Sequence, residues 1–105
     1  SRLTLQNANY VEQATRIRLQ QAVEQAYLNM NATYNRYKAI LQQVDAFQES
    51  FAATEARFNE GVLNSVDYLT AKNNLDRAST SLITAKYEYV FRTRILDYYQ
   101  GKPLW

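Results

Sequence analysis

The residues best suited to specific interactions lie in one short segment, from Ala56 to Leu69. Asn64 is a good N-cap for a following helix. Asp67 falls in the first turn of that helix, where free amides and the positive end of the helix dipole favour a carboxylate. Gly61 suits the end of the preceding helix, where a residue with positive φ is needed. The chemistry available here is therefore hydrogen bonding at a turn.

The remaining composition argues against catalysis. The 105 residues include no cysteine and no histidine, so the common soft metal ligands and the usual nucleophile–base pairs are absent. No acid/base pair or phosphate-cradling loop can be assembled either. We therefore predict that the chain is not an enzyme and has no catalytic residue, no metal site and no cofactor.

Charge and hydropathy exclude two further classes. The 12 basic and 10 acidic residues give a net charge of +2, and no basic stripe interleaves with aromatic residues, so nucleic-acid binding is not expected. No apolar run approaches the roughly 20 residues that a helix needs to cross a bilayer, so a membrane-spanning helix is not expected within this sequence.

The elements that position the Gly61 segment are two amphipathic stretches. Their apolar residues recur at steps of three and four, which is the spacing of a helix that packs along its length against another helix. In the first stretch these residues are Val23, Tyr27, Met30, Tyr34, Tyr37, Leu41, Val44, Phe51 and Phe58, with a gap at Gln48. In the second they are Tyr68, Ala71, Leu75, Ala78, Leu82, Ala85, Tyr89, Leu96 and Tyr99, interrupted by Arg92.

Only one internal turn is signalled, because both glycines and the proline lie at this turn or at the C-terminus. We therefore predict an all-α fold, a long antiparallel, coiled-coil-like α-helical hairpin with helices at about 3–59 and 65–100 and a tip at 60–64. The first helix would overhang the second, so that Leu3 to about Ala22 would have no partner within the chain.

One further surface on each predicted helix bears on whether the hairpin packs against additional helices. The apolar face of the second helix widens toward the C-terminus through six additional residues: Ile83, Tyr87, Val90, Phe91, Ile95 and Tyr98. A face this broad exceeds what one partner helix covers. In the first helix, an alanine recurs every seven residues from Ala32 to Ala53, either as a close-packing stripe or simply through helix propensity. We expect one part of a larger bundle, and self-association of the isolated chain.

The turn leaves one question open. Val62 and Leu63 are adjacent apolar residues at the far end of a thin hairpin, where burial is difficult. Leu63 and Tyr68 occupy the N′ and N4 positions of a hydrophobic staple, and Val62 can fold back toward Ala56. The pair is explained either by capping alone or by a docking surface for a partner.

The run from Arg57 to Lys72, with its aromatic residue, Gly61, capped helix start and Asp-x-Leu-x-Ala-like order, resembles the periplasmic tip of TolC-like outer-membrane efflux proteins. The stretch from Val23 to Asn29 resembles the long helix leading to that tip. The end of the chain, from Leu96 to Leu104, resembles the close of the same domain. The resemblance covers nearly the whole chain and is most specific at the tip and the C-terminus.

The resemblance implies a trimeric channel in the cell outer membrane with a long α-helical tunnel through the periplasm. Residues 1–105 would form a single periplasmic α-hairpin, the second of two in each protomer and part of a larger α-barrel bundle. Its tip would dock to a periplasmic adaptor (membrane fusion) protein, which joins the channel to an inner-membrane pump for export of small molecules or proteins. The implied docking residues are Phe58, Gly61, Val62, Leu63 and Asn64, and Asp67 matches an acidic position near the tunnel entrance.

The sequence departs from the family pattern at two positions, and these differences limit which family features the resemblance implies here. Some family members carry a second acidic residue where Thr70 stands, and some carry a basic residue at the position of Leu63 that joins a closing polar network. The chain therefore lacks the second acidic residue of such a constriction, and the closing network is not transferred to it. The alternative function is a structural coiled-coil scaffold or self-association module with no transport role. Because the chain begins at Ser1 already in a helical pattern, we expect it to be a piece of a longer protein.

Overall fold

One helix accounts for more than half of the chain. In the computed structural model, which describes residues 1–101, α1 (Arg2–Asn59) has 58 residues. It begins where the Ser1 side chain accepts a hydrogen bond from the Thr4 amide. At 1.5 Å per residue α1 is about 87 Å long, and the molecule measures 89 × 23 × 15 Å. The second helix, α2 (Ser65–Tyr99), has 35 residues. The predicted helices are confirmed to within one residue at each end.

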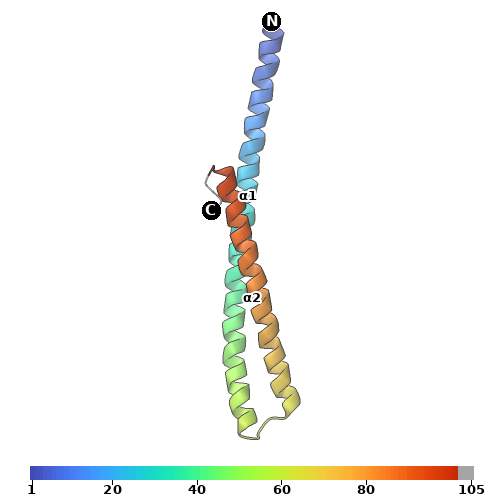
Figure 1. Ribbon diagram of the computed structural model, residues 1–105, viewed down its shortest axis with the longest axis vertical. Helices are drawn as coiled ribbons and strands as arrows, with labels where there is room; N and C mark the ends of the chain where they lie inside the picture. Colours follow the sequence, from blue (N-terminus) through green and yellow to red (C-terminus); the bar gives the residue numbers. More distant parts are fainter. Residues whose placement is uncertain (102–105) are drawn as a thin grey trace.

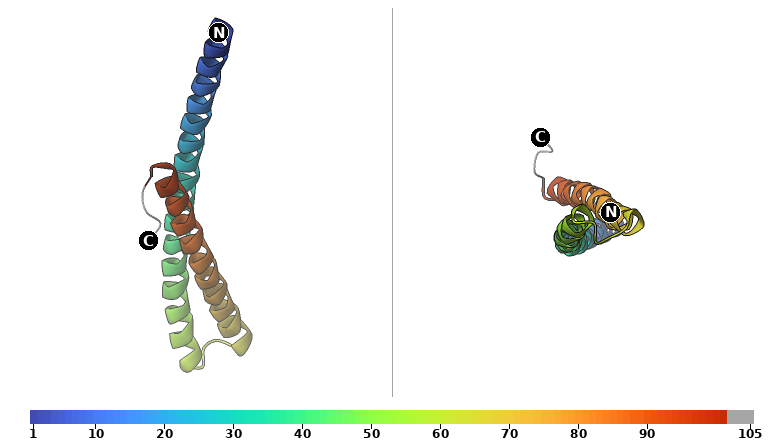
Figure 2. Two further views of the ribbon diagram at one scale, coloured as in Figure 1. Left: turned by 45° about the horizontal axis from the view of Figure 1, so that its top comes forward. Right: turned by 90° about the horizontal axis from the view of Figure 1, so that it is seen from below.

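The two helices form an antiparallel hairpin (Figure 1). They lie close together near the C-terminal half of α2 and diverge toward the tip, as a second view also shows (Figure 2). The N-terminal part of α1 extends beyond the end of α2, and residues 1–21 are all exposed. The predicted overhang without an intramolecular partner is therefore confirmed.

The seam between the helices follows a strict seven-residue repeat. On α2, the seam contains the residues that the sequence predicted. Ala78, Ala85 and Leu96 are buried, and Arg92, which interrupted the predicted apolar pattern, is half-buried at its step of the repeat. The α1 side alternates between two series of positions. One series was predicted and contains Val23, Met30, Tyr37, Val44, Phe51 and Phe58; the other contains Ala26, Thr33, Ile40, Phe47 and Thr54, and all of these residues are buried or half-buried.

The second of these α1 series corrects the prediction. Tyr27, Tyr34 and Leu41 were expected in the seam, but they are 54%, 39% and 38% exposed and lie one position beyond it. Tyr99 of α2, also expected there, is 40% exposed. A tyrosine can lay its ring along a helix pair while its hydroxyl stays in water. The seam takes Ala26, Thr33 and Ile40 in their place, and the gap at Gln48 disappears because Phe47 fills that step.

Aromatic contacts and one ion pair join the helices near the middle of the molecule. The Tyr89 ring lies 5.4 Å from that of Tyr34 and 6.2 Å from that of Tyr37. Arg36 and Glu88 form an ion pair across the helices at 3.1 Å. The seam residue Thr33 donates its hydroxyl to the Met30 carbonyl, so its polar group is satisfied within the helix.

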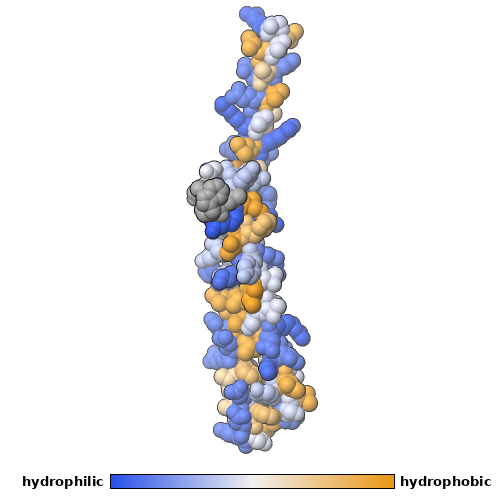
Figure 3. Space-filling view, in the orientation of Figure 1, coloured by the Kyte–Doolittle hydropathy of each residue, from blue (hydrophilic) through white to orange (hydrophobic). Residues whose placement is uncertain are grey.

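Large apolar side chains remain uncovered on the outer surface (Figure 3). Five of the six residues that widen the α2 face are exposed: Ile83, Tyr87, Val90, Phe91 and Tyr98. The sixth, Ile95, is half-buried, and the alanine series from Ala32 to Ala53 is exposed throughout. Within residues 1–101 only α1 and α2 pack together, and no other described residue covers these surfaces.

Candidate functional site at the hairpin tip

The end of α1 is closed by a Schellman motif. Glu60 is the C-cap, and Gly61 follows with φ 78°. The Gly61 amide donates to the Phe58 carbonyl at 3.0 Å, and the Val62 amide donates to the Arg57 carbonyl at 2.9 Å. These are the two hydrogen bonds that define the motif. No atom would touch a Cβ added at Gly61, so the backbone conformation, rather than space, favours glycine there.

The start of α2 is capped as the sequence predicts. Asn64 has an extended backbone, with φ −82° and ψ 167°, and its side-chain oxygen accepts a hydrogen bond from the Asp67 amide at 2.9 Å. The Asp67 side chain is exposed in the first turn of α2. Its carboxylate therefore lies at the positive end of the helix dipole while staying in contact with solvent.

A small aromatic cluster supports the tip from within. The ring of Tyr68 stacks on that of Phe58, with centroids 4.6 Å apart and planes at 23°. The ring of Phe51 lies 5.6 Å from Tyr68 at a tilt of 42°. All three residues are half-buried, and so is Leu63 at the N′ position. This cluster links α1 to α2 where the two helices diverge.

The structure separates the five residues expected to dock a partner. Phe58 packs inside the aromatic cluster, Gly61 and Asn64 form the caps, and Leu63 is half-buried. Val62 alone among them presents an apolar side chain to solvent, with 69% exposed. The expectation of an exposed pair at Val62 and Leu63 thus holds only for the first residue.

Two further exposed apolar residues continue from Val62, and they were not singled out from the sequence. Val66 is 68% exposed and Leu69 is 51% exposed. We call Val62, Val66 and Leu69 the tip stripe. Val66 and Leu69 are three residues apart and therefore share one face of α2. Val62 lies in the turn, four residues before Val66. That spacing was visible in the sequence and could have identified the stripe.

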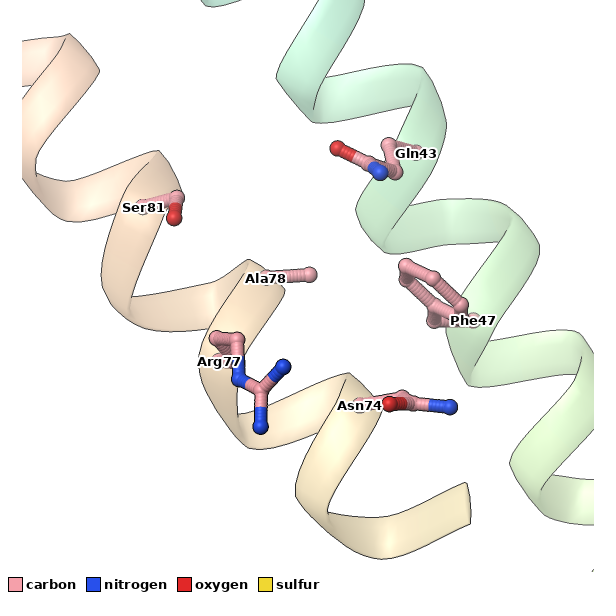
Figure 4. Close-up of a pocket in the computed structure, with 6 residues that line it drawn as sticks. All are labelled: Gln43, Phe47, Asn74, Arg77, Ala78 and Ser81. Atoms are coloured by element: carbon pink, nitrogen blue, oxygen red, sulfur yellow. The ribbon is translucent and has the colours of Figure 1, made fainter. Parts of the chain in front are cut away.

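A shallow crevice separates the helices between the tip and the middle of the seam (Figure 4). Phe47 of α1 and Ala78 of α2 point toward each other across it. Polar side chains complete its lining: Gln43, Asn74, Arg77 and Ser81. The side chains of residues 1–101 include no group of three or more possible metal ligands.

Neither α1 nor α2 is apolar enough along its length to span a bilayer.

A long two-helix hairpin with a doubly capped tip and uncovered outer faces defines a helical-hairpin module. Residues 2–97 match the model of the family described as outer membrane efflux protein, and the chain belongs to that family. The chain is similar to outer membrane protein TolC of Salmonella enteritidis, with 32% identity over 81 residues, or 77% of this chain. No solved structure matches it. The predicted resemblance to TolC-like efflux proteins is therefore confirmed.

The match covers only part of that relative. The aligned residues amount to 16% of the length of the Salmonella protein. The predicted placement in the outer membrane is confirmed at the level of the family, which is one of efflux proteins and not of enzymes. The family match also favours a transport role over the alternative of a coiled-coil scaffold.

Proposed function

We propose that this chain forms one periplasmic hairpin in the tunnel wall of a trimeric outer-membrane efflux channel. The observation that carries the proposal is the family match over residues 2–97, on a chain that folds as one long hairpin. The overhang of residues 1–21 and the exposed outer face of α2 are surfaces that adjacent helices of such a wall would cover. The hairpin performs no chemistry, and the energy for export comes from an inner-membrane pump.

The tip is the proposed docking element for a periplasmic adaptor protein. Val62 supplies the exposed apolar contact, while Gly61 and Asn64 hold the turn in one conformation through their caps. Phe58 and Leu63 support the turn from the inside. A preorganised turn loses little conformational entropy when a partner binds, which strengthens binding at a small surface. Asp67, exposed beside the turn, is proposed to lie at the tunnel entrance.

Cysteine crosslinking in the channel that contains this hairpin tests the docking proposal. The chain has no native cysteine. We expect Val62→Cys to crosslink to the adaptor, and Lys86→Cys to remain unlinked. Lys86 serves as the control because it is also exposed, lies on α2 far from the tip, and is outside the apolar face that adjacent helices would cover. Assembled channels in which Val62→Cys gives no crosslink would contradict adaptor docking at the tip.

A further inference from the structure

Arg92 is a charged residue at a seam position of α2, at the step between Tyr89 and Leu96. Its side chain is half-buried. A leucine there would continue the apolar seam, whereas a half-buried cation has to keep its head group hydrated or paired. The packing of α1 against α2 therefore does not explain a guanidinium at this position.

The Arg92 guanidinium has no acidic partner within residues 1–101, since none of the ion pairs of this part of the chain includes it. Glu88, one helical turn earlier, pairs instead with Arg36 across the helices at 3.1 Å. The guanidinium lies 6.0 Å from the centroid of the Phe91 ring. Such a contact with a ring does not use the five N–H donors of the guanidinium, so these donors remain for a ligand.

Arg92 lines an open hollow near the end of α2, together with other side chains that can donate hydrogen bonds. Gln25 and Asn29 of α1 and Tyr99 of α2 line the same hollow. The Gln25 amide donates to Asn29 Oδ1 at 3.0 Å, so that oxygen is occupied and Asn29 Nδ2 is left to donate. No aspartate or glutamate of residues 1–101 lines the hollow. A positive charge with further donors is the complement of a carboxylate.

An apolar surface borders this hollow. Ile95 and Tyr99 line both the Arg92 hollow and a second one, which also contains Phe91 and Tyr98. Phe91 is 61% exposed and Tyr98 is 66% exposed. Both hollows lie toward the end of α2, which runs beside the part of α1 where the overhang begins (Figure 1). Uncovered apolar surface of this kind indicates a neighbour, and a neighbour seated here would also exclude water from Arg92.

We infer that Arg92 binds an aspartate or glutamate side chain on a helix of an adjacent hairpin. The inference rests on the proposed function, which supplies such a helix. A guanidinium that loses water on assembly is costly unless a carboxylate and well-placed hydrogen bonds replace its hydration. Arg92 can hold both carboxylate oxygens, and Asn29 supplies a further donor.

The apolar border adds a second requirement for the partner. Side chains three or four residues away from the acidic residue lie on the same face of the partner helix. Those side chains would meet Phe91, Ile95 and Tyr98, so they should be apolar. The partner segment is therefore an amphipathic helix whose apolar stripe contains one acidic residue, the counterpart of the stripe that Arg92 interrupts on α2.

Carbodiimide coupling in the assembled channel identifies the partner. Arg92→Lys keeps the positive charge and supplies an amine, which a water-soluble carbodiimide joins to a contacting carboxylate as an amide. Native Lys86 is the control within the same molecule, because it is exposed on α2 and lines neither hollow. We expect peptide mass spectrometry to find position 92 linked to an acidic residue of a different hairpin, and Lys86 not linked to that residue.

Coupling of position 92 only to Glu88, or no coupling there, would overturn the inference and leave the proposed function intact. Failure of the unmodified protein to form a channel would overturn the proposed function itself.

Arg92→Leu separates a partner contact from a role within the hairpin. In the isolated chain at low concentration, we expect the urea midpoint to stay the same or rise, because leucine suits the seam. In the channel, removal of one member of a buried ion pair should weaken assembly by about 30-fold or more, measured by native mass spectrometry over a range of concentrations. Arg92→Glu should weaken it further, and arginine at the coupled acidic position should restore it. Assembly unchanged by Arg92→Leu would overturn the inference, whatever its effect on the isolated chain.

Discussion

The aromatic cluster at the tip predicts a sharp difference between two tyrosines of α2. Tyr68 contacts the rings of Phe51 and Phe58 at 5.6 and 4.6 Å, whereas Tyr87 is 70% exposed. Each ring pair contributes about 0.5–1.5 kcal/mol beyond area burial, so Tyr68→Ala removes about 1–3 kcal/mol. Alanine is the better helix former by about 0.5 kcal/mol. The net expected loss in the free energy of unfolding is therefore about 0.5–2.5 kcal/mol.

For Tyr87→Ala the same helix-propensity gain acts without a ring contact, so we expect a change of at most about 0.5 kcal/mol, in the stabilising direction. Urea unfolding followed by circular dichroism at 222 nm measures both variants. Equal m-values are required for the comparison, and two chain concentrations reveal any contribution from self-association. Tyr68→Phe, which keeps the ring, should lie within about 0.5 kcal/mol of the parent chain. Equal effects of the two alanine variants would refute the assignment of the cluster as a link between the helices.

The remaining predictions concern the caps, the ion pair and the uncovered faces. Gly61→Ala places a Cβ at φ 78° and should destabilise the chain by about 1 kcal/mol in the same urea assay; an unchanged midpoint would show that the turn relaxes. Asn64→Ala should cost about 1 kcal/mol through loss of the cap, and Asn64→Ser should restore most of it; equal losses for both would contradict capping. A double-mutant cycle on Arg36 and Glu88 should give a coupling of at most about 1 kcal/mol that weakens in 1 M salt; a salt-independent coupling would indicate that the pair is shielded from solvent. Sedimentation of the chain should show self-association that Phe91→Ser reduces, whereas a clean monomer at high concentration would contradict the exposed face as a contact surface.

The helices and caps were predictable because their determinants are local. Gly61 and Asn64 act on amides within a few residues, so the order of residues at the turn suffices to place both caps. The two helix lengths then determine the overhang, since both helices start from one turn. The family resemblance added the biological context, which neither periodicity nor capping supplies.

The α1 seam was only half predictable. Apolar spacing points to Tyr27, Tyr34 and Leu41 as readily as to their neighbours, because both sets recur every seven residues. Packing against α2 decides between them: its alanines at 78 and 85 are buried, whereas tyrosine can remain at the edge with its hydroxyl in water. A threonine such as Thr33 enters the seam because its hydroxyl bonds within its own helix.

The tip site was also predicted in part. The sequence identified the turn, but it grouped Val62 with Leu63 by adjacency in the chain. The geometry instead places Leu63 half-buried and Val66 in solvent. Neighbouring residues at the start of a helix point in different directions, so residues three and four apart share a surface more readily than adjacent ones.

The unbroken seven-residue repeat also gives the hairpin a handedness. A straight α-helix drifts by about 20° per heptad relative to such a repeat. From Val23 to Phe58 the seam covers five heptads, so about 100° of rotation must be absorbed by winding the two helices left-handedly about each other. Every flank of the hairpin follows that winding, and a row of residues seven apart traces a slanting line around the molecule. In the proposed tunnel wall, adjacent hairpins could therefore stay in contact along their length only if they shared this hand, which would turn a straight wall into a twisted one.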